Sequence, residues 1–70
     1  MTDVLDLRGL PPPEPLVRTL EAVEALPDGG ELVVLTERRP VHLLPLLAER
    51  GVEVTARELE DGHEIHILRR

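Results

Sequence analysis

Four prolines fall within eight positions in the stretch GLPPPEPL, residues 9 to 16, between a strand-like and a helix-like segment. A residue that precedes proline is driven into extended or polyproline conformations, so residues 10 to 12 form a stiff connection. Pro13 and Pro15 suit the first turn of a helix, where backbone N–H groups have no intrahelical acceptor. Glu14 between them is well placed against the positive end of the helix dipole. The stretch predicts a rigid connection that leads into a helix.

The segments on either side of this connection have the periods of a strand and of a helix. In residues 3 to 8, Leu5 and Leu7 alternate with Val4, Asp6 and Arg8, which is typical of a half-buried strand. In residues 14 to 26, the apolar side chains Leu16, Leu20, Val23 and Leu26 recur at steps of four, three and three. This spacing predicts an amphipathic helix, and the Pro-Asp-Gly-Gly sequence that follows predicts its end.

The rest of the chain adds a strand, a helix and a hairpin. Residues 31 to 36, ELVVLT, are a continuous apolar run and predict an interior strand. We expect a helix of about ten residues to end at Gly51, with Pro45 in its first turn or at a kink, and to pack mainly through Leu43, Leu44 and Leu47. Two alternating segments flank an Asp-Gly turn in the last twenty residues, which predicts a hairpin.

The order of these elements, βαβαββ, predicts one domain over residues 1–70. Right-handed crossovers place both helices on one face, so we expect an α+β fold, a two-layer α/β sandwich with an open sheet face. Periodicity leaves open whether the last strand lies at the edge or between the second and third. One pair from ELVVLT must also lie on the open face, as ordinary exposed side chains or as a homodimer contact. The polar residues that we expect there are Asp6, Glu53, Arg57, Glu64 and His66.

Composition excludes several functions. The 70 residues contain no cysteine, which removes disulfides, thiolate nucleophiles and cysteine metal sites. The net charge of −6 disfavours nucleic acid as a partner. No apolar run is long enough for a membrane span and no signal-peptide pattern is present, so we expect a cytoplasmic protein without membrane contact. Lysine, asparagine, glutamine and serine are absent too, which fits a thermophilic or GC-rich source.

The carboxyl ends of the parallel strands are the favoured place for a binding site. The arginines of this edge, Arg8, Arg38 and Arg39, either hold an anionic group or a partner's acidic side chains, or are solvated or paired with Glu14, Glu37 or Glu60. We expect no catalytic residue, no metal ligand and no cofactor. The residues that we expect to bind a ligand or protein partner are Arg8, Gly9, Pro12, Pro13, Glu14, Pro15, Arg38, Arg39 and His42.

An alternative function uses histidines. His42 and His63 can approach each other across this edge and, with a carboxylate, form an open metal site. The protein would then be a metal- or cofactor-dependent redox accessory. Other catalytic patterns are missing, because the chain has no serine for a Ser-His-Asp triad and no Gly-rich phosphate loop.

The segment LDLRGLPPPEPL, residues 5 to 16, resembles the signature of the TusA/SirA-type sulfur-carrier family. Members of that family read leucine-arginine-glycine-leucine, a variable residue, then cysteine-proline-glutamate-proline. The chain resembles still more a cysteine-less, uncharacterised relative of that family, sometimes attached to hemerythrin-like domains. A charged stretch before a Pro-x-x-Leu segment in that relative is similar to TERRPVHLL, residues 36 to 44.

The resemblance implies a four-stranded mixed sheet in order 1-2-4-3, with the last strand antiparallel. It also implies that Pro12 occupies the position of the sulfur-carrying cysteine, although a proline ring has no nucleophilic atom. We therefore expect a non-catalytic TusA-like module of unknown specific role, and not a cysteine persulfide carrier. It would bind a protein partner or a small ligand through the loops that precede the two helices.

Overall fold

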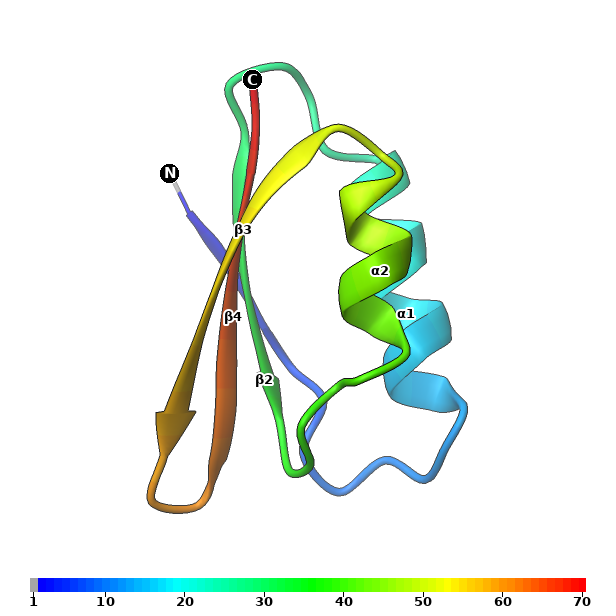
Figure 1. The fold of residues 1–70 in the computed structure, drawn as a ribbon, viewed down its shortest axis with the longest axis vertical. Helices are drawn as coiled ribbons and strands as arrows, with labels where there is room; N and C mark the ends of the chain where they lie inside the picture. Colours follow the sequence, from blue (N-terminus) through cyan, green and yellow to red (C-terminus); the bar gives the residue numbers. More distant parts are fainter. Residues whose placement is uncertain (1) are drawn as a thin grey trace.

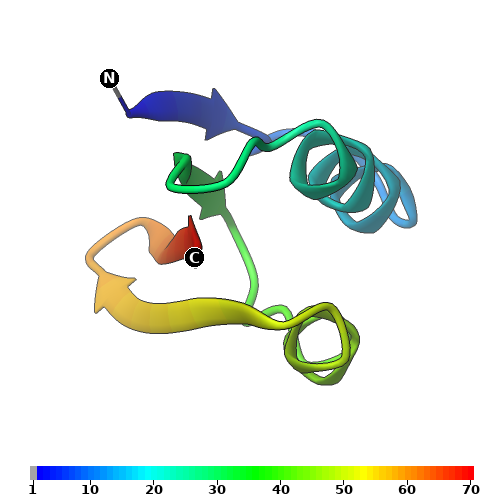
Figure 2. The same cartoon turned by 90° about the horizontal axis from the view of Figure 1, so that it is seen from above.

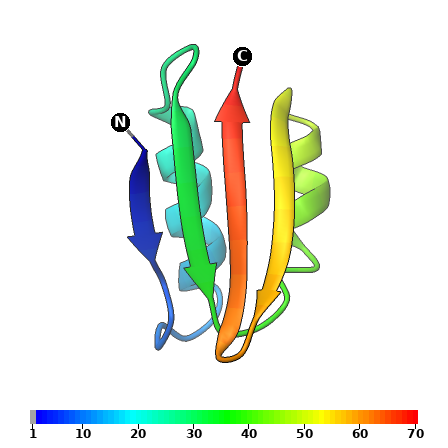
Figure 3. The same ribbon diagram turned by 90° about the vertical axis from the view of Figure 1, so that its left-hand side faces the viewer.

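The structure, a computed structural model, describes residues 2–70. The four strands form one sheet in the order β1-β2-β4-β3, in which β1 and β2 are parallel and β4 is antiparallel to both of its neighbours (Figure 3). This confirms the α+β class and the inserted position of the last strand. The elements are β1 (Asp3–Asp6), α1 (Glu14–Glu24), β2 (Glu31–Thr36), α2 (Leu43–Ala48), β3 (Val52–Leu59) and β4 (Gly62–Arg69).

Both helices cover the same face of the sheet, as the right-handed crossovers require (Figures 1 and 2). The core lies between the two layers, and its largest fully buried aliphatic side chains come from both helices, β2 and β4. No helix within residues 2–70 combines the length and the apolar character that a membrane crossing needs. The core residues with no exposed surface are Val23, Val34, Leu47, Ile65 and Ile67.

The buried face of α1 contains a polar residue that the hydrophobic spacing does not predict. Thr19 and Val23 are its buried residues. Burial of the threonine is tolerated because its hydroxyl donates a hydrogen bond of 2.7 Å to the carbonyl oxygen of Pro15, one turn earlier. The leucines predicted to face the core are only partly buried: Leu16, Leu20 and Leu26.

The second helix is shorter than the sequence predicts. It spans six residues, Leu43–Ala48, where about ten are expected. A turn precedes it, in which the carbonyl of Pro40 accepts hydrogen bonds from the amides of Leu43 and Leu44. Pro45 lies in the first turn, where the loss of an amide donor has little effect. Leu43 and Leu47 are buried, as predicted.

The open face of the sheet confirms the predicted alternation. The strand register places Val33 and Leu35 on the face opposite the buried Ile65 and Ile67. Partly exposed aliphatics are ordinary on a surface, so a homodimer through this face stays a prediction. Light scattering over a dilution series would show it as a mass twice 7.8 kDa. The predicted polar residues also lie on this face: Asp6, Glu53, Arg57, Glu64 and His66.

A contact at the end of the chain holds α1 against the sheet. The Nη2 atom of Arg69 donates a hydrogen bond of 2.7 Å to the carbonyl oxygen of Val23, in the last turn of α1. The same carbonyl accepts a backbone hydrogen bond of 3.1 Å from the N–H of Leu26, and the helix dipole favours a cation at this end of the helix. We expect Arg69→Met to lower the free energy of unfolding by about 1 kcal/mol in urea denaturation. The loss is moderate because the Nε atom of Arg69 is buried without a partner and methionine removes it.

The control for this prediction is Arg18→Met, which removes an exposed ion pair on the same helix. We expect its effect on unfolding to be smaller, because exposed i,i+4 pairs contribute about 0.3–0.5 kcal/mol. Equal effects of the two substitutions would contradict a capping role for Arg69.

Candidate functional site

Three loops meet at one edge of the sheet. The strands β1, β2 and β3 point in the same direction, so their carboxyl ends reach this edge together (Figure 3). The edge collects the connection from β1 to α1, the connection from β2 to α2, and the turn between β3 and β4 (Figure 1). The edge at which the sequence predicts a binding site is therefore formed by segments distant in sequence.

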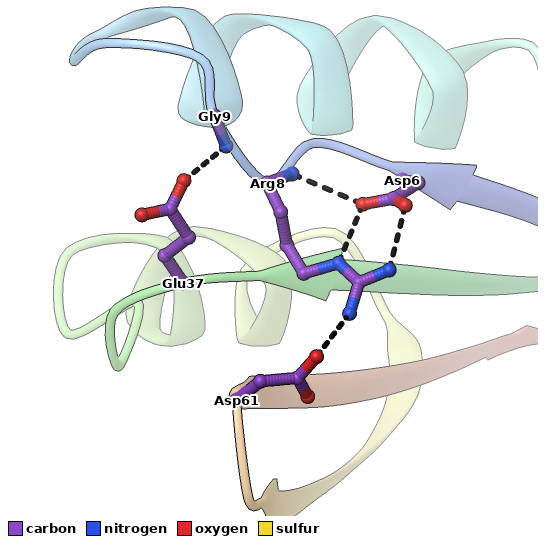
Figure 4. Close-up of polar contacts among 5 residues, drawn as sticks. All are labelled: Asp6, Arg8, Gly9, Glu37 and Asp61. Carbon is purple, nitrogen blue, oxygen red and sulfur yellow. Dashed lines mark hydrogen bonds and ion pairs between the residues drawn. The ribbon is translucent and has the colours of Figure 1, made fainter.

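Arg8 joins the first and third of these loops (Figure 4). Its Nε and Nη2 atoms donate hydrogen bonds of 2.9 and 2.8 Å to the two carboxylate oxygens of Asp6. Its Nη1 atom donates one of 2.9 Å to Oδ2 of Asp61 in the hairpin turn. The guanidinium of Arg8 is thus engaged by two carboxylates of the chain itself. Arg8 is therefore paired within the chain and does not present a free guanidinium to a ligand. Its partners are Asp6 and Asp61, and not one of the glutamates that the sequence suggests.

Two further contacts fix the second loop. The backbone N–H of Gly9 donates a hydrogen bond to the carboxylate of Glu37, which follows β2 (Figure 4). Gly62, which begins β4, lies so close to β2 that a Cβ atom there would come within 2.3 Å of the carbonyl oxygen of Thr36. Together with Arg8, these contacts tie all three loops into one unit.

The Arg8 contacts predict an unusual titration of Asp6. Hydrogen bonds from the Arg8 side chain, and then from its backbone N–H, lower the pKa of this carboxyl from 3.8 to about 2. Because the pKa is lower in the folded chain, the interaction stabilises the fold above a pH of about 4 and is lost as the pH falls toward 2. In a carbon-13 NMR titration, we expect a midpoint of about 2 in the wild type and a higher one in Arg8→Ala, which loses the side-chain hydrogen bonds and keeps the one from the backbone N–H.

The matched control is Arg18→Ala, which removes an arginine paired with Glu14 elsewhere. We expect the Asp6 midpoint to stay low in this variant. A wild-type midpoint near 3.8 would show that the Arg8 contacts do not persist in solution.

A cavity of about 650 Å³ opens between the proline connection and the β2–α2 loop, and we call it the proline groove. Arg8 does not line it, because its guanidinium faces Asp6 and Asp61. Glu14 does not line it either, and its carboxylate accepts a hydrogen bond of 3.2 Å from Arg18. The other predicted binding residues all line the groove: Gly9, Pro12, Pro13, Pro15, Arg38, Arg39 and His42.

The walls of the proline groove are mostly apolar. Leu10 and Val41 contribute side chains that are 40% and 57% exposed, on opposite loops. Leu43 and Leu16 add apolar surface from the two helices. Leu10 and Val41 are not among the site residues predicted from the sequence. The sequence feature that sets them apart is that neither fits the periodic apolar pattern of a strand or helix. Exposed aliphatics that line a cavity favour the binding of an apolar group.

Comparison with known proteins places the chain in a family. Residues 4–69 match the profile of a family described as "Uncharacterized conserved protein (DUF2249)". The chain belongs to this family. A search of curated proteins found no match. The structure is similar to the crystal structure of a SirA-like protein from Desulfitobacterium hafniense, with a TM-score of 0.80, 22% identity, and coverage of 94% of this chain and 95% of that one.

These results confirm the resemblance read from residues 5 to 16, and they place this member of the DUF2249 family on a SirA-like fold. Pro12 stands one residue before Pro13, the N-cap of α1, and it lines the proline groove. The chain has no thiol at this or any other position. The side chain at the signature position can therefore contribute surface to the groove but no nucleophile.

The histidines proposed as metal ligands line different cavities. His42 lines the proline groove, whereas His63 lines a second cavity of about 320 Å³ that also contains residues of β3 and β4. Within residues 2–70, no group of three or more histidine, aspartate or glutamate side chains is arranged to hold a metal ion. No observation of the structure therefore favours the redox alternative over a binding module.

Proposed function

We propose that this protein is a non-catalytic binding module that holds a protein partner or a small ligand in the proline groove. The observation that carries the proposal is a largely apolar cavity of about 650 Å³ at the carboxyl edge of the parallel strands. Ligand sites of proteins are typically apolar cavities with a few convergent polar groups, often at this edge of an α/β sheet. Here the polar side chains of the lining are Thr36, Glu37, Arg38, Arg39 and His42.

The rigidity of the groove supports the same proposal. Proline residues fix one wall, and the contacts Gly9–Glu37 and Arg8–Asp61 fix the position of that wall relative to the other loops. A site that is ordered before binding loses less conformational entropy when its ligand arrives. The lack of any nucleophile at Pro12 supports binding without sulfur transfer.

Two valines provide a matched test. Val41 is 57% exposed in the proline groove, and Val4 is 64% exposed on the open face of the sheet. An aspartate at either position adds one negative charge to a surface site. We expect Val41→Asp to abolish binding and Val4→Asp to leave it intact.

The measurement uses nitrogen-15 labelled protein and extract of the source cell, separated into a protein fraction and a small-molecule fraction. We expect one fraction to shift the amide signals of residues 9, 10, 16, 37–39 and 41–43 in the wild type and in Val4→Asp, but not in Val41→Asp. Signals that move on the open face, and disappear with Val4→Asp, would assign binding to the sheet and contradict the proposal. An extract without any Val41-dependent effect would contradict it as well.

A further inference from the structure

The arginines of this chain differ in whether they have an internal partner. Arg69 donates to the Val23 carbonyl. Arg38 and Arg39 are exposed, adjacent, and without an ion pair or side-chain hydrogen bond to any of residues 2–70. Both line the proline groove. The arginines that pair with a carboxylate are Arg8, Arg18, Arg50, Arg57 and Arg70.

A shortage of acidic side chains does not explain this difference. The chain has 14 aspartates and glutamates against 8 arginines, and its net charge is −6. In such a chain, adjacent arginines without partners form a local positive site on a molecule that is negative elsewhere. The planar guanidinium group matches a carboxylate in two-point hydrogen bonding, so the natural complement of Arg38 and Arg39 is one or two carboxylates.

The residues around Arg38 and Arg39 favour one kind of ligand, which carries carboxylates on apolar groups. They disfavour a polyanion. Glu37 lines the proline groove beside the two arginines, where its carboxylate accepts a hydrogen bond from the backbone N–H of Gly9, and Glu58 lines the second cavity. These acidic groups and the net charge of −6 repel a ligand as densely charged as a nucleic acid backbone. Most of the groove wall is proline, leucine and valine, which binds an apolar side chain. The fitting ligand is therefore apolar and acidic at the same time.

The shape of the surface favours an extended chain over a compact small molecule. Arg39 and Pro40 line both the proline groove and the second cavity, so the two cavities meet at these residues. Their combined track runs from the proline connection, past Arg39, to His63 on β4. Prolines lack the N–H groups needed to add a strand to a sheet, so recognition here depends on side-chain contacts.

We infer that the occupant of the proline groove is an extended acidic segment of a partner protein, which packs an apolar side chain on the prolines and pairs its carboxylates with Arg38 and Arg39. This inference rests on the proposed function, because it takes the proline groove as the binding site. It adds that the occupant is a protein segment and that this segment is both acidic and apolar.

The test is a selection from a phage-displayed library of random short peptides. We expect the wild type to select peptides in which aspartate or glutamate neighbours a large apolar residue. The variant Arg38→Glu/Arg39→Glu should select lysine or arginine in place of the acids. The control Arg18→Glu/Arg70→Glu changes the net charge equally at two exposed arginines that do not line the groove, and it should select as the wild type does.

Fluorescence polarisation of the best acidic peptide then measures the effect. We expect the Arg38→Glu/Arg39→Glu variant to bind it at least about tenfold more weakly, and the control variant within about twofold of the wild type. All variants change exposed side chains, and circular dichroism verifies that they are folded. Selected peptides without acidic residues, or equal binding by the Arg38→Glu/Arg39→Glu variant, would overturn the inference.

One more measurement separates this inference from the proposed function. Glutarate, a small dicarboxylate, is titrated into the labelled protein. One outcome is that glutarate shifts amide signals in a way that depends on Val41, Arg38 and Arg39 while the library yields no peptide. That result would leave the groove as a binding site but overturn the peptide as its occupant. A selected peptide whose binding depends on Val4 and not on Val41 would overturn both.

Discussion

Replacing Gly62 with alanine is expected to lower the free energy of unfolding by more than about 2 kcal/mol, a large share of the stability of so small a domain. The added Cβ atom would lie 2.3 Å from the carbonyl oxygen of Thr36 and 3.3 Å from its carbonyl carbon. Both atoms belong to the backbone of β2, so no side-chain rotation relieves the overlap. The φ angle of Gly62, +156°, is also unfavourable for any residue with a side chain.

Gly51→Ala is the matched control for this prediction. Gly51 also has a positive φ angle, +70°, but a Cβ atom there would meet nothing within 4 Å. Its replacement therefore measures backbone strain alone, which is about 1–2 kcal/mol. We expect guanidinium denaturation to show a clearly larger loss for Gly62→Ala. Equal losses in the free energy of unfolding would show that Gly62 does not lie as close to the Thr36 carbonyl in solution as it does in the structure.

The substitution at Gly62 also tests how the site is held together. Asp61 precedes this glycine and accepts a hydrogen bond from Arg8, while Glu37 follows Thr36 and accepts one from Gly9. A displaced hairpin would separate Asp61 from Arg8. We expect the amide signals of residues 8, 9 and 37 to shift in Gly62→Ala and to stay unchanged in Gly51→Ala.

Hydrophobic periodicity predicts most of this fold, because each element buries one of its faces, including β2, whose residues alternate between buried and half-buried. The alternation of Glu64 and His66 with Ile65 and Ile67 is visible in the sequence and matches their burial. Periodicity does not predict the place of β4 in the sheet, since a strand shows the same alternation of polar and apolar residues at the edge and between β2 and β3. The order 1-2-4-3 follows instead from the family resemblance at residues 5 to 16.

The contacts of the site that are local in sequence can also be predicted from it, whereas the long-range contacts cannot. Asp6 and Arg8 are two residues apart in an alternating segment, so their common face is visible in the sequence. The contact of Arg8 with Asp61 spans 53 positions and depends on the strand order and the hairpin register together. Val41 gives no periodic signal because it lies in an irregular loop, so its place in the groove is visible only in three dimensions.

Pro12→Cys is expected to give this protein a reactivity that it otherwise lacks. The variant would carry the only thiol of the chain, at the position where the sulfur carriers that it resembles keep their cysteine. The position lies at the amino end of α1 and lines a groove that contains Arg38 and Arg39. A helix N-terminus and nearby cations both favour a thiolate over a thiol.

The thiolate of Pro12→Cys is expected to attack a terminal sulfur of inorganic polysulfide, displace the shortened polysulfide anion and gain the mass of one sulfur atom, which dithiothreitol then removes. Val4→Cys, exposed on the open face, is the control, and we expect it to react more slowly at neutral pH because it lies within β1, not at a helix end, and does not line the groove that contains Arg38 and Arg39. Equal rates would show that the groove does not activate a thiol, whereas sulfur uptake by the wild type would contradict a module without a nucleophile. A fast reaction of Pro12→Cys alone would mean that this scaffold keeps the electrostatics of a sulfur carrier, and that the proline is what separates binding from transfer.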